Sequence, residues 1–255
     1  FYNANTENDA GGLSGSRDIT GLDKTDARYF HGGDLAGLKS KLSYLRRMGV
    51  NAIWISPPFK NAPTSGSSAG YHGYWAQDYT QVDPHWGTNA EMADFIAQAH
   101  RYRIKVYFDV VLNHTADVIR FEQCHNADGT LKDGMSNCPY RSLEQSATDP
   151  YTPFIPAGQE NAKQPAWLND PGVYNNQGDS TFAGESTVYG DFFGLDDLNT
   201  NDQRVIDGMI DIFNGWITDF GIDGFRVDTI KHVDDDMWLQ WLPAVKAHAA
   251  SQGKA

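Results

Sequence analysis

The chain has 255 residues, of which 40% are hydrophobic, so it is long enough to bury one large core or two smaller ones. It contains no apolar run of the roughly 18 residues that a helical membrane span needs, and no charged-then-apolar leader segment. The net charge of −13 argues against nucleic acid, whose binding requires a basic surface. We therefore expect a neutral partner, and the 13% of aromatic residues supplies candidate rings for stacking on an uncharged carbohydrate.

The first part of the sequence alternates between helical and extended patterns. Apolar periodicity predicts a helix over residues 34–48, and a short strand follows at 50–56. The low-complexity patch at 64–70 is expected to be a loop. A capping box at residues 88–91 begins a second helix. The nearly continuous apolar run at 105–114 is typical of a parallel strand buried on both faces.

The last part of the sequence resumes the same alternation. A helix over 202–220 leads into a buried strand that carries Asp228, and a final helix covers 235–252, where Pro243 should kink or shorten it. This order predicts an α/β fold with a parallel sheet, either a barrel or a doubly wound sheet. Residues 115–200 show no sustained period and are rich in Gly, Pro, Asn and Asp, which indicates an inserted, irregular and functional subdomain.

Two cysteines, Cys124 and Cys138, lie close together within this insertion. Their spacing favours a local disulfide and therefore an oxidising compartment, although two free thiols remain an alternative. A bridge closing a loop of about 15 residues would stabilise the fold by about 3 kcal/mol.

The most informative segment is residues 224–232, Gly-Phe-Arg-Val-Asp-Thr-Ile-Lys-His. Side chains alternate along a strand, so Arg226 and Asp228 share one face, where the guanidinium can keep the carboxylate ionised for nucleophilic attack. Lys231 and His232 follow at the carboxyl end of the strand, where an α/β barrel places its chemistry.

Two further motifs accompany this segment: Asp109-Val-Val-Leu-Asn113-His114, and Tyr71-His-Gly-Tyr-Trp-Ala-Gln-Asp78. Together the three resemble the α-amylase family of glycoside hydrolases. The resemblance implies a partial (β/α)8 TIM barrel, about strands 2 to 4, with an irregular domain B inserted after strand 3. It divides the chain into residues 1–114 and 201–255 of the barrel and residues 115–200 of domain B.

The resemblance also implies site residues. Asp228 would be the nucleophile, with Arg226 beside it and Asp109 supporting the arginine. His114 would hydrogen-bond the reacting sugar. Tyr74 would form the stacking platform, with His72 and Trp75 nearby, and Lys231, His232 and Phe193 would complete the substrate-binding set. A bulky Phe193 is typical of cyclodextrin glucanotransferases more than of hydrolases.

Calcium is the cofactor that the resemblance implies. A first ion would be held by Asn113, Asp197 and the backbone carbonyls of Val188 and His232, because hard cations take oxygen ligands. For a second ion, the pattern resembles that of cyclodextrin glucanotransferases and provides Asn3, Asn5, Asn8, Asp9, Gly32 and Asp34. Asp34 has an alternative role as a helix N-cap.

The expected function is retaining hydrolysis of α-1,4-glucosidic bonds in starch or maltodextrin by a secreted enzyme. A cyclodextrin glucanotransferase-like transglycosylase and a non-catalytic binding subunit with the same fold are the alternatives. Retention needs a second carboxyl group as general acid. The resemblance puts that glutamate on the strand after Ala255, so we expect this chain to be an inactive, poorly soluble fragment that lacks the rest of the barrel.

Overall fold

The computed structural model describes residues 2–254 and shows two compact units, each assembled from separated stretches of chain. Unit 1 contains residues 1–110, 211–228 and 245–255, and unit 2 contains residues 111–210 and 229–244. The domain boundaries expected from the sequence, 114/115 and 200/201, stay a prediction. In the described part of the chain, no helix has the length and apolar character needed to cross a membrane.

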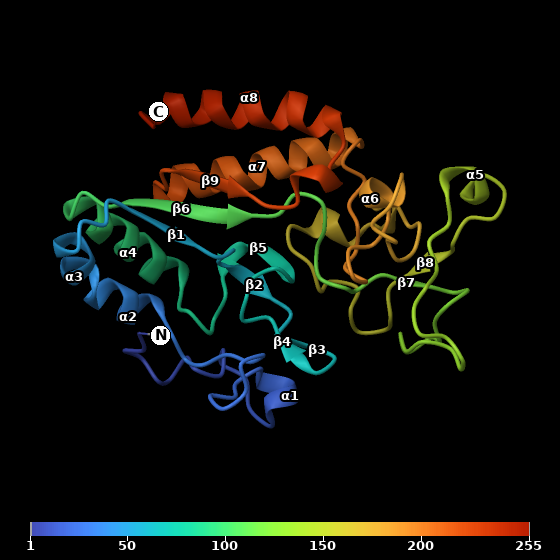
Figure 1. The fold of residues 1–255 in the computed structure, drawn as a ribbon, viewed down its shortest axis with the longest axis horizontal. Helices are drawn as coiled ribbons and strands as arrows, with labels where there is room; N and C mark the ends of the chain where they lie inside the picture. The colour runs from blue at the N-terminus through green and yellow to red at the C-terminus, as the bar shows by residue number, and fades with distance from the viewer. Residues whose placement is uncertain (1, 255) are drawn as a thin grey trace. The chain divides into compact units, whose positions relative to one another are not determined.

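A three-stranded parallel sheet lies at the centre of unit 1 (Figure 1). It consists of β1 (Ala52–Ile55), β6 (Lys105–Val110) and β9 (Gly224–Val227), in the order β1-β6-β9. The register pairs Trp54 with Tyr107 and Asp109 with Arg226. The predicted α/β class with a parallel sheet is therefore confirmed. The expected burial of β9 is wrong, because in the described chain it is an edge strand and its residues are only partly buried.

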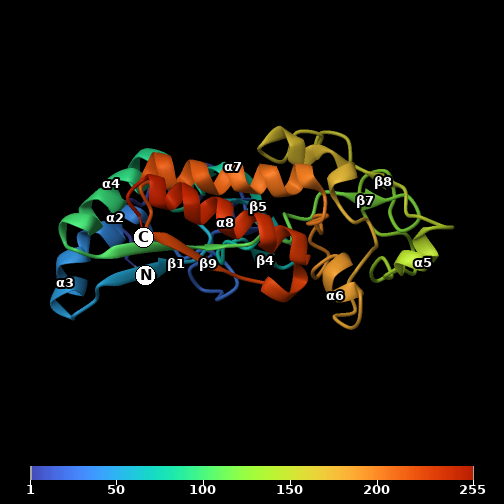
Figure 2. The same cartoon turned by 90° about the horizontal axis from the view of Figure 1, so that it is seen from above.

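The helix that packs beside the sheet begins as the sequence predicts. α4 (Asn89–Arg101) has a complete capping box: the Glu91 amide donates to Thr88 Oγ1 at 3.2 Å, and the Thr88 amide donates to Glu91 Oε2 at 2.8 Å. Its apolar face, which includes Met92 and Phe95, is buried. α4 also packs against α2 (Leu35–Ser40), as Figure 2 shows.

The single helix expected over residues 34–48 is wrong, because the chain forms two. α2 ends at Ser40 and α3 covers Leu42–Arg47, with Lys41 as the cap residue between them. The Ser40 hydroxyl donates to the Gly37 carbonyl at 2.6 Å, a local bond that competes with the helical ladder.

Aromatic packing joins the sheet to the second half of α7 (Gln203–Phe220). The Trp216 ring lies 5.6 Å from Phe108 on β6, and Phe213 lies 5.2 Å from Phe225 on β9. The Trp216 indole also donates to the Tyr79 carbonyl at 2.7 Å. These contacts make the core of unit 1 mainly aromatic on this side of the sheet.

Two expected elements differ from the prediction, whereas the final helix has nearly its predicted bounds. The strand predicted over 105–114 ends at Val110, because the next residues turn to pair with a later segment. The loop expected at 64–70 is a small hairpin, and the final helix is not shortened at Pro243.

The remaining elements of unit 1 are α1 (Arg17–Thr20), β2 (Phe59–Asn61), β3 (Thr64–Ser65), β4 (Ser68–Ala69) and β5 (Ala76–Val82). α8 (Asp235–Ser251) begins in unit 2 and ends in unit 1.

Outside the parts of α7 and α8 that it contains, unit 2 has little regular structure, as expected for the insertion. Between residues 111 and 202 no described element is longer than four residues. These elements are β7 (Arg120–Phe121), α5 (Leu143–Ser146), β8 (Pro153–Phe154), η1 (Ala166–Asn169), η2 (Pro171–Val173) and α6 (Ser186–Tyr189), and η3 (Ile230–His232) follows later.

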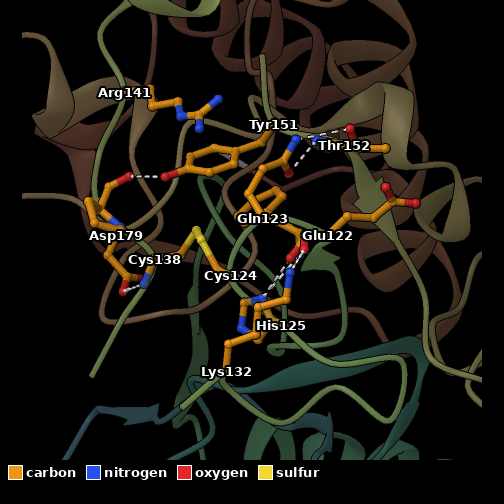
Figure 3. Close-up of a disulfide and its surroundings, with 12 residues drawn as sticks. Glu122, Gln123, Cys124, His125, Lys132, Cys138, Arg141, Tyr151, Thr152 and Asp179 are labelled. Carbon is orange, nitrogen blue, oxygen red and sulfur yellow. Dashed lines mark hydrogen bonds between the residues drawn. A yellow bond between two sulfur atoms is a disulfide. The ribbon is translucent and has the colours of Figure 1, made fainter. Parts of the chain in front are cut away.

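A disulfide between Cys124 and Cys138 joins two loops of unit 2 (Figure 3). Both cysteines are buried, and the Asp179 amide donates to the Cys138 carbonyl at 2.7 Å. The Tyr151 hydroxyl donates to the Pro139 carbonyl at 2.7 Å, beneath the guanidinium of Arg141. The bridge therefore lies within a hydrogen-bonded and aromatic environment.

Candidate active site

A cluster of charged side chains lies at the carboxyl ends of β6 and β9 in unit 1. Arg226 Nη1 lies 2.8 Å from Asp228 Oδ1 and 3.1 Å from Asp109 Oδ2. The register pairs Asp109 with Arg226, and the Asp228 amide donates to the Val110 carbonyl at 2.9 Å. Asp109 is 0% exposed, whereas the side chain of Asp228 is 31% exposed. One arginine therefore bridges an inaccessible carboxylate and an accessible one.

Aromatic side chains surround this cluster. The Tyr74 hydroxyl donates to Asp109 Oδ2 at 3.0 Å, and the Trp54 ring centre lies 5.2 Å from the Arg226 guanidinium. The His72 ring stacks on Tyr74 at 5.7 Å and meets Trp75 edge-on at 4.6 Å. The structure thus brings together all the unit 1 residues that the sequence proposed around the reacting sugar.

Burial shifts the pKa of three groups in this site. It raises the pKa of Asp109, against the lowering effect of the hydrogen bonds from Tyr74 and Arg226. Burial together with the neighbouring charge of Asp109 raises the pKa of Tyr74 to about 12. Burial lowers the pKa of His72 to about 4. The His72 imidazole is therefore neutral at pH 7, and its Nδ1 accepts the Tyr74 amide at 3.0 Å.

In unit 2, the segment after β6 pairs with the segment around Asp197. The Leu198 amide donates to the Asn113 carbonyl at 2.7 Å, and His114 forms a β-bridge with Asp197. The Asn113 Oδ1 atom lies 2.6 Å from Thr229 Oγ1 and 2.9 Å from His114 Nδ1. This pairing explains why the apolar run at 105–114 leaves the sheet at residue 110.

Two buried carboxylates of unit 2 have no cationic partner. Asp191 and Asp197 make no ion pair with a basic side chain among the described residues, and burial raises the pKa of each well above its ordinary value. Asp191 Oδ1 accepts the Asp197 amide at 3.1 Å, and Asn175 Nδ2 donates to Asp197 Oδ2 at 2.7 Å. A hydrogen bond from the Asn113 side chain lowers the pKa of Asp197, against the larger effect of burial.

This chemistry fits a hard divalent cation, because two buried carboxylates without an ion-pair partner among the described residues are stabilised by one doubly charged ion. No group of three or more His, Cys, Asp and Glu side chains in the described chain is arranged to hold a metal. An ion at Asp197 would therefore depend on the Asn113 amide and on backbone carbonyls, as the sequence prediction has it. The carbonyls of Val188 and His232 belong to α6 and η3, which pack together.

The neighbouring Asp196 is neutralised from within the protein. Lys163 is 1% exposed, and its Nζ contacts Asp196 Oδ2 and lies 3.0 Å from the Tyr174 hydroxyl. The Asp196 carboxylate also accepts the backbone amides of Val118 and Ile119, at 2.9 and 3.0 Å. This buried ion pair connects three segments of unit 2 that are distant in sequence.

The other predicted residues of unit 2 have different surroundings. Phe193 is 79% exposed and contacts Phe182, with 4.7 Å between ring centres. Both rings, together with Arg120, line a cavity of about 440 Å³ within unit 2. His232 is buried, and its Nδ1 lies 2.6 Å from the Thr187 carbonyl, whereas Lys231 is exposed. Lys231 therefore has no defined role in the described structure.

The amino-terminal residues proposed for a second calcium lie together in unit 1, but most of their oxygens already accept hydrogen bonds. Asp34 is the N-cap of α2, because its Oδ1 accepts the Gly37 amide at 2.5 Å. This hydrogen bond supports the alternative that the sequence left open for Asp34.

Sequence reasoning missed Trp54, Lys163, Asp191 and Asp196. A tryptophan within a short apolar strand was a usable signal in the sequence for Trp54, which the structure shows to be exposed. No sequence signal marked the Lys163–Asp196 pair, because the two residues are 33 positions apart within a segment without periodicity.

Comparison with known proteins identifies the chain's relatives. Residues 1–250 match the family model for the α-amylase catalytic domain. An α-amylase of Streptomyces lividans is 48% identical over 95% of this chain and 28% of its own length. A periplasmic α-amylase of Escherichia coli K12 is 32% identical over 83% of this chain and 37% of its own length. A cyclomaltodextrin glucanotransferase of Geobacillus stearothermophilus is also 32% identical, over 91% of this chain and 29% of its own length.

Solved structures agree with these matches. An α-amylase from Anoxybacillus has a TM-score of 0.67 at 29% identity and covers 98% of this chain and 43% of its own. A cyclomaltodextrin glucanotransferase with three domains has a TM-score of 0.71 at 26% identity, over 96% of this chain and 46% of its own. The chain spans 28% to 37% of the length of the three curated relatives. It belongs to the α-amylase family of glycoside hydrolases and has the fold of the family's catalytic domain.

Proposed function

We propose that the protein containing this chain hydrolyses α-1,4-glucosidic bonds of starch-type glucans with retention of configuration. The observation that carries the proposal is the Arg226 bridge, which holds a partly exposed Asp228 beside a fully buried Asp109. The α-amylase of Streptomyces lividans supports it, as does an α-amylase of Geobacillus thermoleovorans that was crystallised with acarbose. The periplasmic relative supports an extracytoplasmic location, and the disulfide fits one.

In this mechanism the Asp228 carboxylate attacks the anomeric carbon, and the bond to the leaving glucosyl oxygen breaks as that oxygen takes a proton. Water then hydrolyses the glycosyl-enzyme ester and releases the carboxylate. Arg226 contacts and orients Asp228, Asp109 holds the arginine, and the Tyr74 hydroxyl donates to Asp109. Tyr74, His72 and Trp75 offer rings for the sugar face.

The proton donor needs a second carboxyl group about 5 to 5.5 Å from the nucleophile. Asp109 does not suit this role, because it is 0% exposed and accepts hydrogen bonds from both Tyr74 and Arg226. We propose that the acid is supplied by residues outside this 255-residue sequence, and that the three-stranded sheet is part of a larger barrel. The matched region is only 28% of the Streptomyces relative, and the rest of that protein is long enough to contain both the acid and the other strands.

The decisive experiment replaces Asp228 in a protein that includes the remaining barrel. Asp228→Asn should lower glucan turnover by several orders of magnitude, because it removes the covalent catalyst without changing side-chain volume. Asp219→Asn, an exposed position on α7, is the matched control and should leave the rate unchanged. A variant that keeps more than about a tenth of the wild-type rate would contradict the assignment of the nucleophile.

The 255-residue chain provides a separate test of the missing acid. We expect it to cleave no starch when purified alone. Cleavage by the monomeric chain at an enzymatic rate would place the acid within it, and Glu144, Glu160 and Glu185 of unit 2 would become the candidates.

Transglycosylation is the second candidate function. The exposed Phe193 favours it, because a large ring at this position can hold a glucan chain against a sugar acceptor. The cyclomaltodextrin glucanotransferase relatives also support it. Product analysis with maltooligosaccharides would separate the two, since hydrolysis gives only shorter linear products. A non-catalytic binding subunit is disfavoured by the intact Arg226 and Asp228 pair.

We also propose one calcium ion in unit 2, held by Asn113, Asp197 and the carbonyls of Val188 and His232. It would supply positive charge to the uncompensated Asp191 and Asp197 and hold the chain at the two ends of the insertion together. Chelation should lower the melting temperature, since a ligand that binds only the folded state stabilises it. Unchanged melting after exhaustive chelation, with metal analysis showing no calcium, would remove this site.

A further inference from the structure

The amino-terminal loop of unit 1 already contains a cation. The Lys24 ammonium lies 2.7 Å from Asp9 Oδ2; the side chain of Asp9 is only 9% exposed, whereas that of Lys24 is 52% exposed. The other carboxylate oxygen, Asp9 Oδ1, accepts the Asn3 amide nitrogen at 2.6 Å. Asp9 is therefore a buried carboxylate whose two oxygens are both satisfied by side chains of the same unit.

Most of the other side-chain oxygens proposed as ligands also accept hydrogen bonds. Asp34 Oδ2 accepts the amides of Ala4 and Asn5, at 3.0 and 2.7 Å, and Asp34 Oδ1 caps α2. Asn5 Oδ1 accepts the Glu7 amide at 3.1 Å. The Asp34 carboxylate thus accepts three backbone amides, which satisfy its oxygens without a metal. These bonds fix the loop against the start of α2.

One oxygen of the set is unpaired. Asn8 Oδ1 is buried and has no hydrogen-bond partner. Calcium requires about six to eight oxygen ligands, whereas an ammonium group has only three donors to satisfy. Gly32 adds a steric limit, because a Cβ there would come within 2.5 Å of both Asn3 Nδ2 and Asp9 Oδ1. The backbone therefore packs directly on the Asn3–Asp9 pair.

We propose that the Lys24 ammonium takes the position in this loop that the family resemblance gives to a second calcium ion. The lysine neutralises Asp9, so the loop is ordered without metal. Removal of the ammonium while Asp9 and Asn8 remain would create a position that a divalent cation can enter. Ion binding and stability at this loop do not depend on the proposed activity.

The experiment compares wild type with Lys24→Gln, Lys24→Arg and the matched control Lys39→Gln. Lys39 is another lysine of unit 1, paired with the exposed Asp94. Melting temperature is measured in chelator and in millimolar calcium, and calcium stoichiometry is measured by titration calorimetry on chelator-treated protein. Any ion in unit 2 is common to all four proteins, so differences between them report on the amino-terminal loop alone.

We expect Lys24→Gln to melt several degrees below both wild type and Lys39→Gln in chelator. Added calcium should reverse this deficit, and the variant should bind one calcium ion more than wild type. Lys24→Arg, which keeps the positive charge, should resemble wild type. The proposal is overturned if Lys24→Gln melts like Lys39→Gln, if calcium does not reverse its deficit, or if the stoichiometry equals that of wild type.

Discussion

The parallel sheet of unit 1 and the irregular part of unit 2 use carboxylates in different ways. In unit 1 the parallel sheet satisfies the backbone of β6 and β9, so the carboxylate oxygens of Asp109 and Asp228 are available to Arg226 and Tyr74. In unit 2, where regular elements are short, Asp196 accepts two backbone amides directly. Where regular structure is scarce, charged side chains take over the hydrogen bonding that a sheet would provide. In the sheet, backbone carbonyls satisfy the backbone amides, so the carboxylates there are not needed as acceptors and can take part in catalysis.

The largest expected effect tests this comparison in unit 2. Lys163→Met should destabilise the protein by about 3–5 kcal/mol, because it leaves the Asp196 charge buried and unpaired. Adding Asp196→Asn should recover part of the loss. Denaturant unfolding gives the free energy, and hydrogen exchange locates the change in unit 2. If Lys163→Met cost no more than Lys231→Met at an exposed position, the buried pair would not hold unit 2 together.

The disulfide provides a somewhat smaller test. Replacing both Cys124 and Cys138 by alanine should cost about 3 kcal/mol, because the bridge closes a loop with a sequence separation of 14. Amide exchange should accelerate around Asp179, which donates to the Cys138 carbonyl, and around Tyr151, which donates to the adjoining Pro139, and stay unchanged in β1 and β6. Equal acceleration in both units would mean that they unfold as one, and the contrast between them would not extend to stability.

The smallest effect concerns pH in unit 1. The pKa of His72 is lowered by burial from 6.5 to about 4, so the unfolded chain takes up the proton first as the pH falls. Stability should therefore be complete above about pH 6.5 and decline toward pH 4, by about 1 kcal/mol after allowance for partial exposure. His72→Asn keeps an acceptor for the Tyr74 amide and should flatten this decline. Identical melting profiles for wild type and variant over this range would exclude His72 as the cause.

The sequence predicted those parts of the fold that local rules determine. The start of α4 followed from its capping box, and the contact of Arg226 with Asp228 followed from strand alternation. The division of residues 34–48 into two helices was not predictable from apolar spacing, because a single serine hydroxyl competes with the ladder.

Most of unit 2 could not be predicted for a different reason. Its contacts join residues far apart in sequence, such as Lys163 with Asp196, and no periodic pattern marks them. The likeness to a known family located Asn113 and Asp197, but only the structure revealed that Asp191 is buried beside them.

The pairing of β6 with β9 has a consequence for how the chain folds during synthesis. The hydrogen-bonded partners Asp109 and Arg226 are 117 positions apart. A ribosome that adds about 5 to 20 residues per second would need roughly 6 to 25 seconds to deliver the second strand after the first. Throughout that interval one edge of β6 lacks its eventual neighbour, and a nascent chain in this state is open to pairing with other strands. We therefore expect nascent-chain binding factors and translation rate to affect the yield of this protein more than its final stability would suggest.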